Sequence, residues 1–93
     1  MNDFNKAIKL DPKSDIGYCN RSDAYLRKGK FQMAIDDCNI AIEMNGVSLS
    51  KAYYNRGLCK SELGQNGCSD IKKAKSLGLF AVTDEAIKYF CRE

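Results

Sequence analysis

The stretch Tyr18-Cys-Asn-Arg-Ser22 returns 35 residues later as Tyr53-Tyr-Asn-Arg-Gly57. A second echo follows each copy and also opens the chain. It reads Asp3-Phe-Asn-Lys-Ala7, then Ala34-Ile-Asp-Asp-Cys-Asn-Ile-Ala41, then Gly67-Cys-Ser-Asp-Ile-Lys-Lys-Ala74, and its final alanines lie 34 and 33 residues apart. A fixed period of this size predicts stacked helical hairpins. Such a stack presents an extended surface rather than an enclosed active site.

Composition limits the possible partners. The chain has 93 residues, of which 44% are hydrophobic and 29% charged, as in an ordinary small soluble domain. A net charge of +3, spread along the chain, is too small to favour nucleic acid. No apolar run approaches the roughly 18 residues that a membrane span needs, and the start of the chain does not read as a signal peptide. We therefore expect neither a nucleic-acid nor a membrane partner.

The basic cluster Lys72, Lys73 and Lys75 favours a solvated helix face, with an acidic partner as the alternative.

The cysteines indicate a reducing compartment. Five cysteines are an odd number, no pair has the spacing of a metal site, and there is no His to complete one. A free Cys behaves as a small buried apolar residue. We expect unpaired thiols, a cytoplasmic location, no metal and no cofactor. A redox role is the alternative.

Helix ends are marked by residues that stop or cap a helix. Helices are predicted at 2–10, 15–28, 31–44, 50–63, 67–77 and 84–92. The residues that end them are Pro12, Gly29, Asn45-Gly46, Gly64 and Gly78. The expected N-caps are Ser14 or Asp15, then Ser48 or Ser50, then Thr83. In the helix at 15–28, Ile16 is expected on the apolar stripe.

The set of repeated positions resembles the tetratricopeptide repeat, whose hairpin places aromatic, small and alanine residues at fixed positions and ends in Pro. The matching residues are Phe4, Ala7, Pro12, Tyr18, Arg21-Ser22, Tyr25, Ala34, Cys38, Ala41, Tyr53, Arg56-Gly57, Gly67, Ile71 and Ala74. Lys60 departs from the motif, because it stands where Tyr is usual.

The resemblance implies an all-α fold: a tetratricopeptide-like α-solenoid of about two and a half repeats with a C-terminal capping helix. The single domain 1–93 divides into the second helix of a truncated repeat (1–14), two repeats (15–48 and 49–78) and the capping helix (79–93). On this interpretation the chain is a piece of a longer array. Phe4 and Ile8 then have an unfilled neighbour, and the open end is a hypothetical site for a second copy of the chain.

Catalysis is hard to build from these residues, so we expect no enzyme. There is no His for base chemistry. Asp36 and Asp37 are adjacent on a helix, so their side chains diverge by about 100° and cannot act as a pair. The stretch Gly64-Gln-Asn-Gly67 lacks the Lys of a phosphate loop.

Binding is easier to build. The resemblance implies that the first helix of each hairpin lines a concave groove. Side chains one turn apart on those helices share a face. The predicted peptide-binding residues are Asn20, Asp23, Arg27, Lys51, Tyr54, Asn55 and Leu58. Asn20 and Asn55 are equivalent in the two copies, and an Asn amide matches the donor and acceptor of one peptide unit.

A sharper form of this hypothesis rests on the resemblance alone. Some tetratricopeptide co-chaperones hold the C-terminal carboxylate of a chaperone with a clamp of Lys, Arg and Asn. Asn20 and Lys51 match two clamp positions, whereas Asn55 stands where Lys or Arg is usual. The partner implied is therefore a protein or peptide with an acidic segment or a free C-terminal carboxylate.

Arg21 and Arg56 directly follow the two Asn residues, and their recurrence predicts a structural role, namely hydrogen bonds or ion pairs to Asp37 and Asp70. The function expected is a protein–protein interaction scaffold that binds a peptide in its groove. The alternative is a structural module that assembles as a homodimer.

Overall fold

The computed structural model describes residues 2–79 and 81–91, with side chains from residue 5 onward. The helices are α1 (Asn2–Leu10), α2 (Asp15–Arg27), α3 (Phe31–Met44), α4 (Leu49–Glu62), α5 (Cys68–Ser76) and α6 (Asp84–Phe90). Every predicted helix is present, and the described residues contain no strand, so the all-α prediction is confirmed. No helix in this part of the chain has both the length and the apolarity to cross a bilayer.

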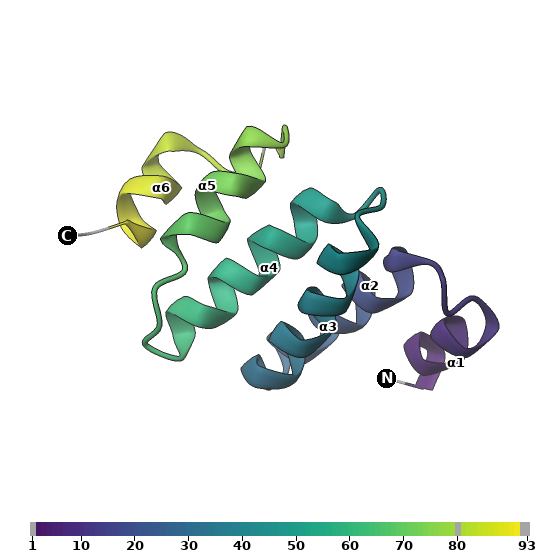
Figure 1. Cartoon of the computed structure of the whole chain (residues 1–93). Coiled ribbons are helices and arrows are strands. Elements are labelled where there is room, and N and C mark those ends of the chain that lie inside the picture. Colours follow the sequence, from purple (N-terminus) through teal and green to yellow (C-terminus); the bar gives the residue numbers. More distant parts are fainter. Residues whose placement is uncertain (1, 80, 92–93) are drawn as a thin grey trace.

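The helices lie side by side in chain order, from α1 at one end to α6 at the other (Figure 1). Each helix packs on the one before it, and α2 also packs on α4 across the hairpin that α3 completes. The molecule is elongated, with principal extents of 42 × 25 × 18 Å. The contact between α2 and α4 matters for function, because it places the first helices of two hairpins on one face.

Helix ends follow the predicted stop signals. Gly29, Gly64 and Gly78 have left-handed φ angles of 76°, 75° and 92°, and Asn45 has φ 52°. Thr83 is the predicted N-cap of α6, and its Oγ1 accepts the Ala86 N–H at 3.1 Å. The sequence thus specifies where the chain reverses.

Two other predicted N-caps are confirmed in position but make no side-chain cap. Ser14 and Ser48 occupy the N-cap positions of α2 and α4, but neither side chain caps its helix. The Ser48 N–H instead donates to Asp15 Oδ2 at 2.8 Å. The buried Asp15 carboxylate therefore ties the α3–α4 loop to the start of α2.

The core lies between the helices in two clusters. The first joins Ala34, Ile35 and Cys59 with flanking Tyr25, Leu26 and Phe31. The second joins Ile71, Ala74 and Val82 with flanking Tyr53, Tyr54, Leu58, Leu79, Ile87 and Phe90. The prediction that Ile16 belongs to the apolar stripe is wrong, because its side chain is 47% exposed.

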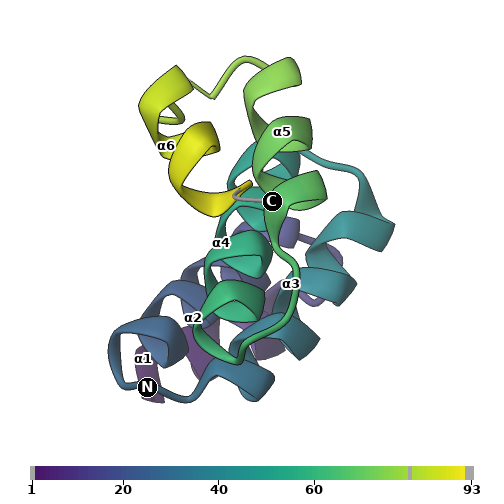
Figure 2. The ribbon, with the colours of Figure 1, turned by 90° about the vertical axis from the view of Figure 1, so that its left-hand side faces the viewer.

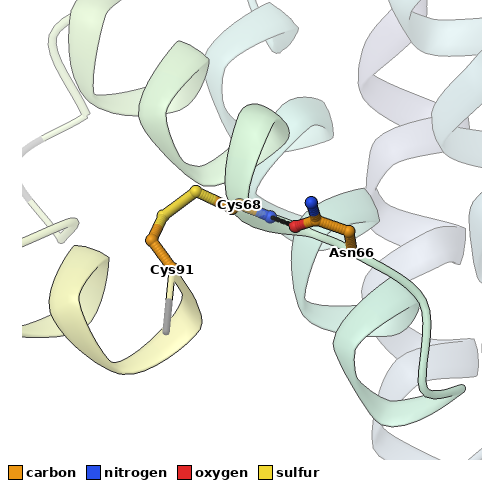
Figure 3. The surroundings of a disulfide bond; sticks show 3 residues. All are labelled: Asn66, Cys68 and Cys91. Atoms are coloured by element: carbon orange, nitrogen blue, oxygen red, sulfur yellow. Dashed lines mark hydrogen bonds between the residues drawn. A yellow bond between two sulfur atoms is a disulfide. The ribbon is translucent and has the colours of Figure 1, made fainter. Parts of the chain in front are cut away.

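One expectation about the cysteines is wrong. Cys19, Cys38 and Cys59 are free and buried as predicted, but Cys68 and Cys91 form a disulfide (Figure 3). The Cys68 N–H also donates to Asn66 Oδ1 at 2.9 Å. The disulfide joins the first residue of α5 to the residue just after α6. Because the chain reverses between these helices, the start of one lies beside the end of the other (Figure 2).

Candidate binding groove

A pocket lies between α2, α4 and the connection from α5 to α6, with a cavity volume of about 270 Å³. Its lining residues come from these three segments: Asp23, Leu26, Arg27, Lys51, Tyr54, Asn55, Leu58, Leu79 and Ala81. We call this cavity the α2–α4 pocket. It forms because α2 and α4 pack side by side and the α5–α6 connection adds a third wall.

The pocket brings together six of the seven predicted groove residues, and Asn20 is the exception. Asn20 is exposed on α2, outside the lining. Leu26, Leu79 and Ala81 were not among the predicted residues. Leu26 is on the apolar stripe of α2, and it serves both the core and the pocket.

The pocket combines apolar walls with charges. Leu26, Leu58 and Leu79 are partly buried there. Arg27 forms an ion pair with Asp23 one turn away at 3.1 Å, and the Arg27 side chain is 78% exposed. Such an exposed pair contributes little to stability. The arrangement suits an apolar side chain flanked by polar groups.

Lys51 is the second cation of the pocket, beside Arg27. It is exposed on the first turns of α4, and it forms no ion pair with another residue in the described part of the chain. Its ammonium group is therefore available to an anion from outside.

Asn55 is held in place by a buried hydrogen bond. Its Nδ2 donates to Ser22 Oγ at 3.2 Å, and the residue is 3% exposed. Ser22 Oγ donates its own proton to the Cys19 carbonyl at 2.6 Å, so it can only accept from Asn55. The two equivalent Asn residues thus differ: Asn55 is fixed by α2, while Asn20 points to solvent.

The structural role predicted for the two arginines is confirmed. Arg21 donates from Nε and Nη2 to the two carboxylate oxygens of Asp37, both at 2.7 Å. Arg56 donates in the same way to Asp70 at 2.9 and 2.8 Å. These hydrogen bonds raise the pKa of both guanidinium groups. Each bidentate pair joins the two helices of one hairpin.

Each arginine also reaches back to the preceding hairpin. Arg21 Nη1 donates to Asn5 Oδ1, and Arg56 Nη1 donates to Asn39 Oδ1, both at 3.0 Å. Sequence reasoning missed these two Asn residues, although their spacing of 34 residues was a usable signal. One arginine per repeat therefore connects three helices, and because both arginines hold α3, the pocket helices α2 and α4 are tied to a common neighbour.

The buried free thiols have low reactivity near neutral pH. Burial raises the pKa of Cys38 to about 12 and of Cys59 to about 11. Within residues 2–79 and 81–91, no group of three or more His, Cys, Asp or Glu side chains could hold a metal ion. The thiolate that reactivity requires is therefore scarce at these sites near neutral pH.

Comparison with known proteins agrees with this geometry. Residues 4–36 match the family model described as tetratricopeptide repeat. A TPR repeat-containing thioredoxin, TDX, from Arabidopsis thaliana is 38% identical over 74 residues, which are 77% of this chain and 19% of that protein. Hsc70-interacting protein 1 from Drosophila melanogaster is 32% identical over 87 residues, which are 91% of this chain and 23% of that protein.

Human RNA polymerase II-associated protein 3 is 38% identical over 60 residues, which are 64% of this chain and 9% of that protein. The chain thus spans at most about a quarter of the length of these relatives. The family match, the relatives and the helix stack of the described residues show that the chain belongs to the tetratricopeptide repeat family.

Proposed function

We propose that this chain is a protein–protein interaction module that binds a peptide segment of its partner in the α2–α4 pocket. The observation that carries the proposal is an apolar cavity whose lining includes a cation with no ion pair to another described residue. Leu26 and Leu58 offer apolar contact, and Lys51 offers charge. Peptides that lie in grooves between helices use this combination of anchors.

The charge of Lys51 favours an acidic ligand. An acidic side chain or a free C-terminal carboxylate of the peptide would face this ammonium group, while a neighbouring apolar side chain fills the cavity. Tyr54 adds a ring beside the cavity, and Tyr is enriched where binding energy concentrates. Asn55 contributes a rigid wall, because its amide is already held by Ser22.

The names of two relatives support a protein partner. One is called an Hsc70-interacting protein and another an RNA polymerase II-associated protein, so both are named for binding or association with another protein. We extend only the general activity, interaction with a protein, to the present chain.

The experiment is a calorimetric titration with a blocked octapeptide of alternating Glu and Leu. Three matched peptides replace Glu by Gln, replace Leu by Ala, or carry a free rather than an amidated C-terminus. We expect saturable binding that weakens with either replacement. Lys51→Gln should weaken it about threefold to tenfold.

Lys73→Gln is the matched control, because Lys73 is an exposed lysine on α5 away from the pocket and the change in net charge is the same. Absence of saturable binding to every peptide, or equal losses in both lysine variants, would contradict the proposal. A gain specific to the free carboxylate would assign the C-terminal carboxylate as the anion.

A second candidate function is self-assembly through the face formed by α1 and the start of α2. Leu10 is 76% exposed and Ile16 is 47% exposed on that face. Phe4, which the sequence suggested as part of it, has a side chain outside the described residues. Ile8 is already covered in part, because it lies against Gly17 of α2.

Light scattering over a range of concentrations tests this second function. A dimer mass that reverts to monomer in an Ile16→Glu variant would support it. A monomer mass at every concentration would exclude it and leave peptide binding as the function.

A further inference from the structure

Helix α6 is held in place by its contacts with the rest of the chain. It has seven residues, none of them buried, so it is too short to be stable by itself. It is attached through Ile87 and Phe90 in the second core cluster, through an ion pair of Lys75 with Asp84, and through the disulfide. Both members of the ion pair are exposed, so that pair is a weak attachment.

The segment leading into α6 is also a wall of the α2–α4 pocket. Leu79 and Ala81 line the pocket, and the next residue, Val82, is 3% exposed in the second core cluster. If α6 left α5, this wall would lose the support of α6 and keep only that of α5, where the Leu79 N–H donates to the Ala74 carbonyl at 3.2 Å. The position of α6 and the shape of the pocket are therefore linked.

Reducing agents can act selectively at the disulfide. Cys68 and Cys91 are partly exposed, whereas Cys19, Cys38 and Cys59 are 1% exposed or less. Burial also keeps the three free thiols protonated near neutral pH, because it raises the pKa of each of them. Thiol–disulfide exchange requires a thiolate and access to sulfur, so it is confined to one pair.

We propose that the Cys68–Cys91 disulfide is a site of reversible exchange with a dithiol reductant, and that its reduction loosens α6 and the pocket wall beside it. A reductant thiolate attacks one sulfur and forms a mixed disulfide, and its second thiol then resolves it. The reductant leaves as a cyclic disulfide, while two electrons and two protons pass to Cys68 and Cys91. The effect on binding rests on the proposed function.

The compartment would set the state of this pair. Disulfides persist in oxidising compartments, and those found in reducing ones are mostly transient or redox-sensing. In the cytoplasm, which the sequence suggested, the pair would rest as two thiols with α6 loosened. In an oxidising setting the Cys68–Cys91 disulfide would form, and the α5–α6 connection would keep its place as the third wall of the pocket.

The first test counts reactive thiols and measures hydrogen exchange with and without dithiothreitol. In the native protein, reduction should expose two alkylatable thiols, at Cys68 and Cys91, and none at the three buried positions. Amide exchange in α6 should rise about a hundredfold, because the cross-link no longer restricts the chain between the two cysteines. Exchange in α2 and α3 should stay unchanged, which shows that the fold survives.

The control is Cys91→Ser, which should exchange like the reduced protein and ignore dithiothreitol. Unchanged exchange in α6 on reduction, or alkylation of the three buried thiols under the same conditions, would overturn the proposal.

The second test repeats the peptide titration on both redox states. The reduced protein should bind about twofold to tenfold more weakly, because its apparent affinity scales with the fraction of molecules in which α6 is still in place. Equal binding by both redox states overturns the proposed link between the disulfide and the pocket, and it leaves the proposed function intact. Absence of binding by both redox states contradicts the proposed function. Hydrogen exchange then tests separately whether reduction of the disulfide loosens α6.

Discussion

Arg21 and Asp37 form a bidentate ion pair between α2 and α3, with both hydrogen bonds at 2.7 Å and the carboxylate side chain only 4% exposed. The Asp37 carboxylate is buried between the two helices, where a carboxylate without a cation would lower the free energy of unfolding. Its counterpart one repeat later, Arg56 with Asp70, has one additional partner: Lys60 Nζ lies 3.5 Å from Asp70.

That difference predicts unequal losses of stability. Arg21→Ala leaves Asp37 without a cation among the described residues, and should lower the free energy of unfolding by about 2–3 kcal/mol. Arg56→Ala should cost about 1 kcal/mol less, because Lys60 can still approach Asp70. Urea unfolding of the two variants measures both values. Equal losses would show that Lys60 does not compensate.

The close contact of α4 with α5 makes a second prediction. A methyl group on Gly67 would overlap the carbonyl oxygen of Gly57, so Gly67→Ala should cost about 3 kcal/mol or more. Gly64→Ala is the matched control. Gly64 has open space around it, and only its left-handed φ of 75° opposes the change, at about 1 kcal/mol. Thermal unfolding should rank Gly67→Ala as the more damaging, and the reverse order would contradict this packing.

The buried thiols predict that stability falls at alkaline pH. A Cys38 thiol with an ordinary pKa of 9.0 ionises in the unfolded chain, while burial raises its folded pKa to about 12. Between these two pKa values the unfolded state binds fewer protons than the folded state. The contribution of the Cys38 thiol to the free energy of unfolding is therefore intact below about pH 9 and is lost as pH rises toward 12.

The slope approaches about 1.4 kcal/mol per pH unit for one such thiol. Unfolding in urea at about pH 8 and about pH 10 measures the loss, and Cys38→Ala should show a smaller loss than the parent chain. An identical loss in both would mean that Cys38 titrates normally in the folded protein.

Salt dependence makes a fourth prediction. Lys51 is exposed, so its attraction for an acidic peptide is screened when the Debye length shrinks from roughly 10 Å at 0.1 M to about 3 Å at 1 M salt. Affinity for the Glu/Leu peptide should fall over that range. In Lys51→Gln the fall should be smaller, and an equal fall would assign the charge contact to another residue.

Much of the fold could be predicted because turn residues and periodic apolar positions are local signals. Gly29, Gly64, Gly78 and Asn45 adopt left-handed conformations at the helix ends where the sequence places them. The positions on α4 were equally accessible, because 3.6-residue spacing puts Lys51, Tyr54, Asn55 and Leu58 on one side of one helix. All four line the pocket.

The remainder depended on how separate segments meet. Leu79 and Ala81 lie in a connection without periodicity, so nothing local marks them as a wall of the pocket. Asn20 and Asn55 are equivalent in sequence, yet burial depends on the neighbouring helix, and only Asn55 has Ser22 against it.

The disulfide could have been predicted from the position of the turn between α5 and α6. Cys68 and Cys91 lie at nearly equal distances from the connection between Ser76 and Asp84, and two antiparallel helices bring such positions together. The order Tyr89-Phe90-Cys91-Arg92 also matches Tyr53-Tyr-Asn-Arg56, with Cys91 in the place of Asn55. The last helix therefore retains part of the repeat in its sequence.

The central claim is that a partner peptide occupies the α2–α4 pocket. It is tested most directly by following backbone amide signals by NMR while the Glu/Leu octapeptide is added to the oxidised protein. We predict saturable shifts concentrated at Leu26, Lys51, Tyr54 and Leu58, and smaller shifts at Leu26, Tyr54 and Leu58 in Lys51→Gln at equal, sub-saturating peptide concentration. Shifts confined to α1 and the start of α2, or no shifts at all, would contradict it.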